Sequence, residues 1–350
     1  MLFVGTPGGL EARLVPEAGV SFRGLKASGF DRARPWTLIT STLRIAVSTV
    51  QAFFVLDSFK PDVVVGFGGY VSIPVGLAAG LRGTPLVVHE QNSVPGLANR
   101  FLSRWANYVG VTYGESCPRF RHRERVEVTG NPVRPAVLAA DRAAGRAALK
   151  LPRTATVLLV FGGSRGARHL NSAMVALHDR VLAVKGVHVV HVAGTAEVDS
   201  VRAALEAAGG GRGRWHVVDY LDDMGSALAA SDLVVARAGA TSIAEITALG
   251  LPAVLVPYPY ATDDHQTKNA ATMVADGAAE LVSDIELDTT RFGDTVVALL
   301  SDKQRRATMA DASRALGRPD AAEQVIELAR TAARPAGVPP QDETTENPVA

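Results

Sequence analysis

Short apolar runs rich in β-branched residues alternate with segments of helical periodicity along most of the chain. This alternation predicts parallel α/β architecture, because a helix after each strand returns the chain to the same edge of the sheet. The pattern predicts ten strands, five in each half of the chain, at residues 2–4, 63–65, 86–88, 108–111, 126–128, 157–161, 188–192, 215–218, 233–235 and 253–256. Two such sets indicate two domains.

Prolines and changes of composition suggest where the domains end. Pro132 and Pro135 keep residues 131–135 out of a helix, and an Ala/Arg-rich helical segment follows. The last residues carry four prolines without apolar periodicity, which is typical of disorder. We therefore expect an N-terminal domain over residues 1–135, a linker over 136–151, a second domain over 152–317, a helix over 318–333 and a disordered tail over 334–350.

Three strand–glycine–helix turns carry the candidate chemistry, at residues 62–72, 156–167 and 233–245. Glycine lets a ligand approach the backbone, and the free N–H groups at a helix N-terminus attract phosphate. Glu245, about one turn into its helix, is placed to hydrogen-bond a ribose hydroxyl. Three such turns predict a nucleotide-sugar enzyme whose site lies between two Rossmann-like lobes.

Composition narrows the class of protein. The chain has 350 residues, of which 47% are hydrophobic and 20% are charged, enough to bury two sizeable cores. Cys117 is the only cysteine, which excludes an intrachain disulfide and fits a reducing cytosolic setting. We expect no signal peptide at Met1 and no membrane span, because no uninterrupted apolar stretch reaches about 18 residues.

The small net charge of +1 hides an asymmetry. Residues 1–135 carry 15 Lys/Arg against 9 Asp/Glu, whereas the remainder carries 21 against 26. A basic first part suits an anionic membrane surface or a phosphate-bearing substrate, and ordinary surface variation remains an alternative. No basic stripe with interleaved aromatic residues indicates a nucleic-acid partner, so none is expected.

Residues 35–59 predict a helix with an apolar face that includes Trp36, Ile39 and Leu43. Four cations precede it, at positions 23, 26, 32 and 34. An apolar face beside cations is typical of an interfacial helix on anionic lipid. A helix buried between a sheet and its loops fits the same pattern.

Six short motifs occur in a characteristic order, at residues 68–72 (GGYVS), 89–92 (HEQN), 130–134 (GNPVR), 162–167 (GGSRGA), 237–245 (RAGATSIAE) and 264–270 (DHQTKNA). Through them the chain resembles the MurG family from about residue 1 to about residue 330. The resemblance implies a GT-B fold, with two Rossmann-like domains facing across a cleft and the 318–333 helix crossing back to the first. Residues 1–135 would be the acceptor and membrane side, and residues 152–317 would bind the UDP-sugar.

The resemblance also implies a reaction and a location. Members of the family move N-acetylglucosamine from UDP-N-acetylglucosamine onto lipid I with inversion, forming lipid II for peptidoglycan. We therefore expect a peripheral protein at the cytoplasmic face of the cell membrane, with UDP-N-acetylglucosamine, lipid I and an anionic membrane surface as partners. A UDP-N-acetylglucosamine 2-epimerase-like enzyme, which shares the architecture but needs no acceptor, is the alternative.

By the same resemblance Ser164 contacts the diphosphate, Glu245 the ribose and Gln266 the sugar hydroxyls, while Arg134 contacts the nucleotide end and the Leu221 backbone holds uracil. The expected donor-binding residues are Asn92, Arg134, Ser164, Leu221, Ala240, Thr241, Ser242, Ile243, Ala244, Glu245 and Gln266. The expected acceptor-binding residues are Gly68, Gly69, Tyr70 and Ser72. We expect the Glu245 carboxylate to be exposed in the cleft.

His89 and Glu90 are the candidate catalytic residues, because they follow a strand at its carboxyl end, where α/β folds place ligands. A histidine can act as a base near neutral pH, and an adjacent carboxylate can orient or tune it. The alternative is structural, with His89 held by backbone and Glu90 fixing the next loop.

We expect neither a metal nor a cofactor. The adjacent pairs 222–223 and 263–264 lack the Asp-x-Asp spacing, and capping or solvation explains them. Helix N-termini after Gly163 and Gly239 can instead stabilise developing phosphate charge.

The chain opens with the short strand 2–4 rather than with a strand, a glycine-rich turn and a helix. We expect the N-terminal domain to lack its first βα unit and the true start to lie upstream. The chain from Met1 would then bind UDP weakly through Ser164 and Glu245 without measurable transfer. A non-catalytic nucleotide-sugar-binding protein is the further alternative.

Overall fold

The computed structural model describes residues 1–25, 37–163 and 167–334, with the side chains of residues 37–42 left aside. The chain forms two compact units. Unit 1 consists of Met1–His89, Leu97–Val109 and Ile326–Ala350, and unit 2 of Glu90–Gly96 and Gly110–Val325. Compactness thus groups residues 110–135 with the second unit, and the expected boundary at residue 135 stays a prediction about folding domains.

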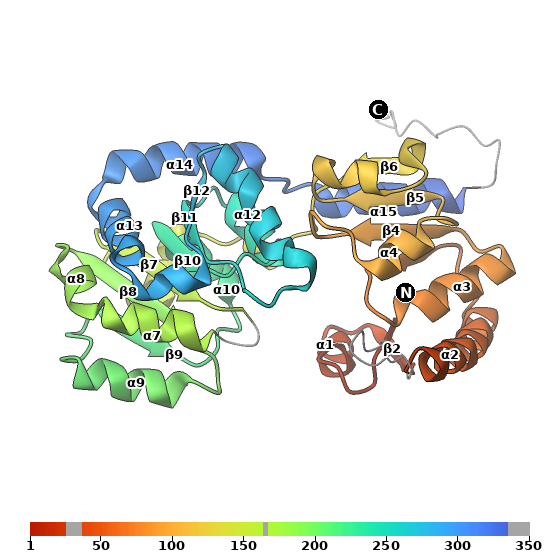
Figure 1. Ribbon diagram of the computed structural model, residues 1–350, viewed down its shortest axis with the longest axis horizontal. Helices are drawn as coiled ribbons and strands as arrows, with labels where there is room; N and C mark the ends of the chain where they lie inside the picture. The colour runs from red at the N-terminus through yellow and green to blue at the C-terminus, as the bar shows by residue number, and fades with distance from the viewer. Residues whose placement is uncertain (26–36, 164–166, 335–350) are drawn as a thin grey trace, which may run out of the picture. The chain divides into compact units, whose positions relative to one another are not determined.

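Unit 2 is built on a six-stranded parallel sheet (Figure 1). Its order is β12-β11-β10-β7-β8-β9, with the chain order reversing between β7 and β10. This is the Rossmann order, in which ligands bind where the order reverses. The strands are β7 (Thr156–Phe161), β8 (Val187–Val192), β9 (Trp215–Val218), β10 (Leu233–Ala236), β11 (Ala253–Leu255) and β12 (Ala279–Leu281).

Helices cover both faces of this sheet (Figure 1), which explains why its central strands β7, β10 and β11 are apolar at nearly every position rather than at alternate ones. Val157 and Leu159 belong to one core cluster, and Leu158 and Val160 belong to the other. The helices and 3-10 helices of unit 2 are α5 (Pro135–Leu138), α6 (Arg142–Ala148), α7 (Arg168–Ala176), α8 (His178–Ala183), α9 (Val198–Ala207), α10 (Met224–Ala230), α11 (Ala240–Ala248), α12 (His265–Ala275), α13 (Thr290–Ser301), α14 (Lys303–Leu316), η1 (Gly114–Arg119), η2 (Arg123–Arg125), η3 (Thr262–Asp264) and η4 (Asp284–Asp288).

A buried ion pair fixes the expected linker segment to the sheet of unit 2. Arg146 of α6 is 5% exposed and pairs with Asp232 at 2.8 Å, while its Nε donates to the Ala230 carbonyl. The same Asp232 oxygen accepts from the Val157 amide at 2.7 Å. A buried charge must be paired and hydrogen-bonded to be tolerated, and here both conditions are met.

The remaining strands form two further parallel sheets. β1 (Leu2–Gly5) pairs with β2 (Ser21–Gly24) in a two-stranded sheet of unit 1. The other sheet has the order β3-β4-β5-β6, and the chain leaves unit 1 within it, at Glu90 and again at Gly110. Its strands are β3 (Val64–Gly66), β4 (Leu86–Glu90), β5 (Tyr108–Val111) and β6 (Val126–Val128). The remaining helices are α1 (Glu11–Glu17), α2 (Thr37–Phe59), α3 (Ser72–Arg82), α4 (Leu97–Leu102) and α15 (Ala321–Ala333).

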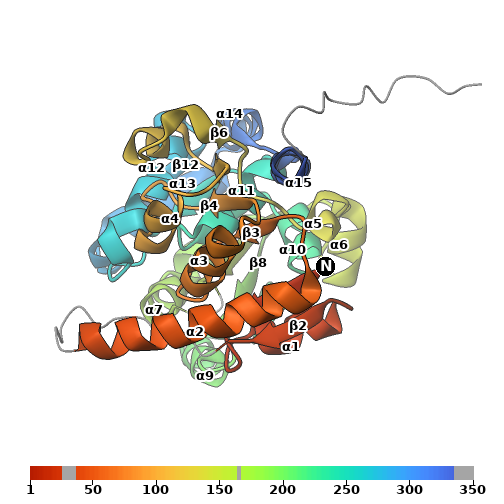
Figure 2. The same cartoon turned by 90° about the vertical axis from the view of Figure 1, so that its right-hand side faces the viewer.

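The long helix α2 lies along α3 in unit 1 (Figure 2), and the helix expected over residues 35–59 is confirmed from Thr37 onward. Ala52 and Leu56 are buried in a cluster with α3. The opposite face exposes apolar side chains that recur every three or four residues. This α2 stripe consists of Leu43, Val47, Val50 and Phe54, each more than half exposed. Trp36, and the side chain of Ile39, lie outside the described residues.

All ten predicted strands are present, within two residues of their predicted ends. β2 and β12 were missed. Residues 21–24 (SFRG) hold one apolar side chain, and residues 279–281 (AEL) contain no β-branched residue. Across the described residues, no helix is long and apolar enough to cross a membrane.

Candidate active site

The candidate site lies at the carboxyl ends of β7 and β10, where the strand order of unit 2 reverses. Gly162 and Gly163 follow β7, and Gly163 has φ +85°, a left-handed conformation that favours glycine. Gly239 caps α11, whose first N–H groups receive no side-chain acceptor from the cap. Both turns therefore have the local structure that accepts an anion. Ser164 lies outside the described residues, so its contact with the diphosphate stays a prediction.

Two of the predicted donor-binding residues, 111 positions apart, are paired with each other. Arg134 donates from Nε and Nη2 to Glu245 Oε1 at 3.2 and 3.1 Å. The side chain of Arg134 is 59% exposed, whereas that of Glu245 is 7% exposed. The expectation of an exposed Glu245 carboxylate was therefore wrong, because helix α11 turns this residue inward, beneath the guanidinium.

Glu90 organises the loop that follows β4. Its carboxylate is buried and accepts from the Asn92 amide at 3.0 Å and from the Gly96 amide at 3.0 Å. The carbonyl of His89 accepts from Asn99 Nδ2, and the His89 ring lies 5.6 Å from that of Phe67. The Glu90 contacts are those of the structural alternative, and the catalytic roles of His89 and Glu90 stay predictions.

Asn269 of α12 joins this loop to the turn before α11 within unit 2. Its Oδ1 accepts from the amide and the hydroxyl of Ser93, at 2.9 and 3.1 Å. Its Nδ2 donates to Asn92 Oδ1 and to the Ala238 carbonyl. Asn269 is fully buried, so its amide is saturated by these partners. Asn92, predicted to bind donor, is thereby held beside the start of α11.

A second network fixes the turn before α11 from the other side. Arg237 follows β10, is 7% exposed, and donates to the carbonyls of Val256 and Pro257. It also forms an ion pair with Asp284 at 2.5 Å. Asp284 in turn contacts Nδ1 of His169, in the first turn of α7, at 2.7 Å. One carboxylate thus connects the start of α7 to the turn before α11.

Within this network, the negative charge of Asp284 and the positive charges of His169 and Arg237 stabilise one another. Burial alone would raise the pKa of Asp284, but the adjacent His169 and Arg237 outweigh it and lower that pKa. The hydrogen bond that the His169 ring donates to Asp284 raises the pKa of His169, Asp288 raises it further, and the smaller effect of burial opposes both. The network is therefore most complete when His169 is protonated.

The predicted sugar- and uracil-binding residues lie on neighbouring loops of unit 2. Gln266 Oε1 accepts from the Tyr258 amide at 2.9 Å. Leu221 is partly buried against the core. Asp263 and Asp264 both have positive φ, +54° and +53°, and this backbone strain immediately precedes α12. Asp223 caps α10 by accepting from the Ser226 amide, as the capping interpretation predicts.

The predicted acceptor residues form a glycine turn after β3 in unit 1. Gly68 and Gly69 have φ +84° and +74°, and the Gly68 carbonyl accepts from the Ser72 hydroxyl. Tyr70 at the tip is 57% exposed. The turn leaves backbone and a phenol open to solvent, and its role in acceptor binding stays a prediction.

Four residues of the networks were not predicted from the sequence: His169, Arg237, Asn269 and Asp284. Arg237 and Asn269 stand inside motifs that the sequence displays, so their position was visible but their partners were not. His169 and Asp284 are 115 positions apart and carry no local signal. Within the described ranges, no group of three or more His, Cys, Asp or Glu side chains is placed to hold a metal ion.

The sequence matches two family models. The Glycosyltransferase family 28 N-terminal domain matches residues 2–111, and the family 28 C-terminal domain matches residues 157–325. A relative from Desulforudis audaxviator, named UDP-N-acetylglucosamine–N-acetylmuramyl-(pentapeptide) pyrophosphoryl-undecaprenol N-acetylglucosamine transferase, is 43% identical over 94% of this chain and 89% of its own length. The chain belongs to the MurG family.

Solved structures agree with this assignment. MurG from Acinetobacter baumannii superposes with a TM-score of 0.72 at 28% identity, covering 94% of this chain and 90% of that one. A putative UDP-N-acetylglucosamine 2-epimerase from Listeria monocytogenes, at 16% identity, has a TM-score of 0.66 over 94% of this chain and 87% of that one, which shows only that the fold is shared. The predicted GT-B class, with two Rossmann-like α/β domains, is confirmed for a member of the MurG family.

Proposed function

We propose that this protein transfers N-acetylglucosamine from UDP-N-acetylglucosamine to N-acetylmuramyl-(pentapeptide) pyrophosphoryl-undecaprenol, forming lipid II. The observation that carries the proposal is the similarity to MurG relatives along 94% of the chain, through both family 28 domains. The candidate site adds support, because the paired Arg134 and Glu245 lie beside the start of α11 at the reversal point of the sheet.

Unit 2 would bind the donor. The amides at the start of α11 and the glycine turn after β7 supply fixed N–H donors for the diphosphate as it leaves. Glu245 would accept hydrogen bonds from ribose hydroxyls, with Arg134 moving its exposed guanidinium to the nucleotide. Asn269 and Asp284 would keep the start of α11 in place from two sides. Fixed dipoles of this kind need no reorganisation at the moment of reaction.

The acceptor hydroxyl must lose a proton during transfer, and we propose the region of His89 and Glu90 for that step. Glu90 holds the loop 91–96 through two backbone amides, so its carboxylate would position Asn92 whether or not it also takes a proton. The glycine turn at residues 68–72 would receive the acceptor. Inversion at the anomeric carbon follows if the acceptor attacks the face opposite the diphosphate.

We further propose that unit 1 rests on the cytoplasmic face of the membrane as a peripheral protein. The α2 stripe offers four exposed apolar side chains on one face of a 23-residue helix, and Leu43 of the predicted membrane set belongs to it. A lipid-linked acceptor makes such a location necessary for encounter. The excess of Lys and Arg in residues 1–135, of which residues 110–135 belong to unit 2, would favour an anionic surface.

The test is transfer by the purified protein extended by the βα unit expected upstream of Met1, because we expect the chain from Met1 alone to bind UDP weakly without measurable transfer. We expect UDP release from UDP-N-acetylglucosamine only when a soluble lipid I analogue is present, together with a disaccharide product identified by mass spectrometry. Incubation with donor alone should give no manno isomer, since an epimerase would form it without acceptor. EDTA should leave the rate unchanged. Donor turnover at the same rate with and without acceptor would contradict the proposed transfer. A rate abolished by EDTA and restored by a divalent metal would contradict the metal-independent reaction.

A further inference from the structure

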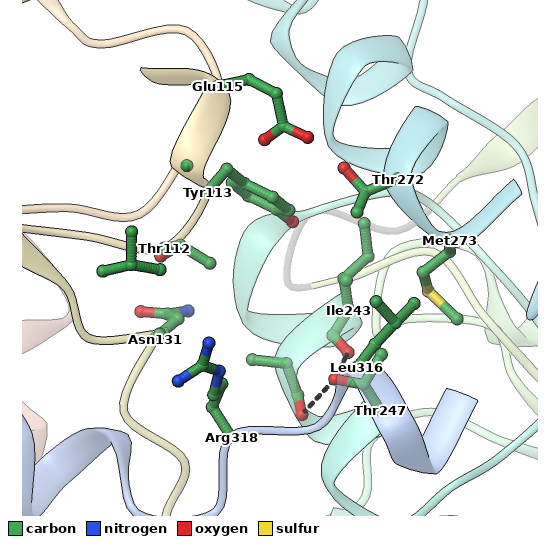
Figure 3. A pocket seen from close by; sticks show the side chains of 14 residues that line it. Thr112, Tyr113, Glu115, Asn131, Ile243, Thr247, Thr272, Met273, Leu316 and Arg318 are labelled. Carbon is green, nitrogen blue, oxygen red and sulfur yellow. Dashed lines mark hydrogen bonds between the residues drawn. The ribbon is translucent and has the colours of Figure 1, made fainter. Parts of the chain in front are cut away.

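Unit 2 contains a cavity of about 200 Å³ (Figure 3), and of the expected donor-binding residues only Ile243 and Ala244 line it. Its walls are residues 112–115, 128–131, α11, α12 and the segment 316–318. Ile243, Ala244 and Thr247 contribute the α11 wall. Ile243 and Thr247 are each two residues from Glu245 and therefore roughly 200° around the helix from it. The cavity thus opens on the side of α11 opposite the Arg134–Glu245 pair.

The hydroxyl of Tyr113 lies at this cavity without a hydrogen-bond partner among the described residues. Tyr113 is 7% exposed, and a buried polar group left unpaired destabilises the folded protein. Burial raises the pKa of Tyr113, and Glu115 raises it further, so the phenol is a proton donor at neutral pH. The nearby Thr247 hydroxyl is already engaged by the Ile243 and Ala244 carbonyls. A ligand that carries a hydrogen-bond acceptor could therefore pair with the Tyr113 hydroxyl.

Two opposite charges flank the phenol (Figure 3). The Glu115 carboxylate lies on one side of Tyr113, and the Arg318 guanidinium lies on the other, near Asn131. Between them, Ile243 and Met273 form an apolar wall. A charge of each sign at the two sides of an apolar cavity complements a molecule that carries both charges itself.

We propose that this cavity binds a small zwitterion, an α-amino acid or dipeptide with an apolar side chain. Its carboxylate would meet Arg318, its ammonium group Glu115, and one of its oxygens the Tyr113 hydroxyl. The side chain would fill the space against Ile243 and Met273. A cavity of about 200 Å³ has room for several waters, and therefore for a small organic molecule such as leucine.

Calorimetric titration with L-leucine, N-acetyl-L-leucine and L-leucinamide tests both charges. We expect leucine to bind saturably in the millimolar range, and the two analogues, which each lack one charge, to bind at least fivefold more weakly. Arg318→Gln and Glu115→Gln should each weaken leucine binding by a similar factor. Lys303→Gln, which removes an exposed cation from α14, is the matched control and should change nothing.

Tyr113→Phe provides a second readout. It should weaken leucine binding and, in the ligand-free protein, raise the melting temperature, because it removes the unpaired hydroxyl and keeps the ring. The absence of saturable leucine binding below about 10 mM, equal binding of the N-acetyl analogue, or an unchanged melting temperature of Tyr113→Phe each overturns the proposal. UDP titration of the same variants monitors the donor site separately, so failure here leaves the proposed transferase activity untouched.

Discussion

Burial constrains Glu245, the carboxylate that is predicted to bind the ribose of the donor. It pairs with a guanidinium that is itself more than half in solvent. The Arg134 guanidinium can therefore move away into solvent, but this would leave the buried Glu245 carboxylate without a partner, which is costly. A ligand hydroxyl that replaces one Arg134 contact keeps the carboxylate satisfied. In the ligand-free protein, the pair with Arg134 therefore satisfies Glu245 until a ligand hydroxyl replaces one of its contacts.

Glu245→Ala should weaken binding of UDP-N-acetylglucosamine by about 2–3 kcal/mol, through the loss of two charge-assisted hydrogen bonds. Because Glu245 is buried, we also expect a small fall in melting temperature, although Arg134 can be hydrated once it is unpaired. Calorimetry with UDP-N-acetylglucosamine and thermal unfolding measure the two effects. Glu323→Ala, which removes an exposed carboxylate from α15, is the control. Unchanged donor affinity would remove Glu245 from the site.

For individual residues, the sequence predicted which residue types and motifs form the candidate site, but not which side chains contact one another. Arg134 and Glu245 were both assigned to the donor site, yet their mutual contact spans 111 residues and depends on how α11 is rotated. The burial of Glu245 could not be predicted, since residues 240–248 are small or apolar nearly all round and give no clear exposed face. Asn269 was recognisable only as part of a motif.

Among the elements, η4 has a role beyond connecting β12 to α13. Through Asp284 it contacts both Arg237, just before α11, and His169, in the first turn of α7. The two helices whose N-termini face the candidate diphosphate site thus share one acidic anchor. Movement of η4 would act both on the start of α7 and on the turn before α11, because the same carboxylate contacts both.

His169→Gln should destabilise the protein more at pH 6 than at pH 9. The pKa of His169 is raised, so its pairing stabilises fully below its ordinary pKa of about 6.5 and fades as pH rises through the raised value. The effect is at most about 1 kcal/mol, since the ring is a third exposed and solvent screens it. Thermal unfolding across pH measures it, with His265→Gln as control, because the His265 ring faces a backbone carbonyl. An equal loss at both pH values would contradict the charged pairing.

The sequence predicted strands most accurately where both faces of the sheet are covered by helices. β7, β8 and β10 are β-branched or apolar at nearly every position and were found within one residue of their ends. β2 and β12 lie at the edges of their sheets, where hydrogen bonding to a single neighbouring strand, rather than side-chain type, defines them. Such strands leave little trace in composition. The orientation of α2, with one face on α3 and one in solvent, also required the packing partner.

For the molecule as a whole, the proposed attachment to a lipid surface would depend on one exposed face of unit 1, the α2 stripe. Val47→Ser combined with Phe54→Ser should reduce co-sedimentation with phosphatidylglycerol vesicles by at least fivefold, because both side chains belong to the α2 stripe and neither is in its buried cluster. Transfer to a soluble acceptor should be unchanged. Ile285→Ser, which alters an exposed apolar residue of unit 2, is the control. Equal vesicle binding by the double variant would mean that another surface carries attachment.

The interleaving of the two units has a consequence for synthesis. Unit 1 is closed by residues from both ends of the chain, since Val87 of β4 packs against Leu328 and Ala332 of α15. A ribosome making this protein releases nearly all of unit 2 before those last contacts exist. The strands of unit 1 must therefore wait, with part of their apolar surface uncovered, while more than two hundred residues are added. Chaperone dependence during translation should fall mainly on the first hundred residues, and truncation before residue 326 should leave unit 1, rather than unit 2, prone to aggregation.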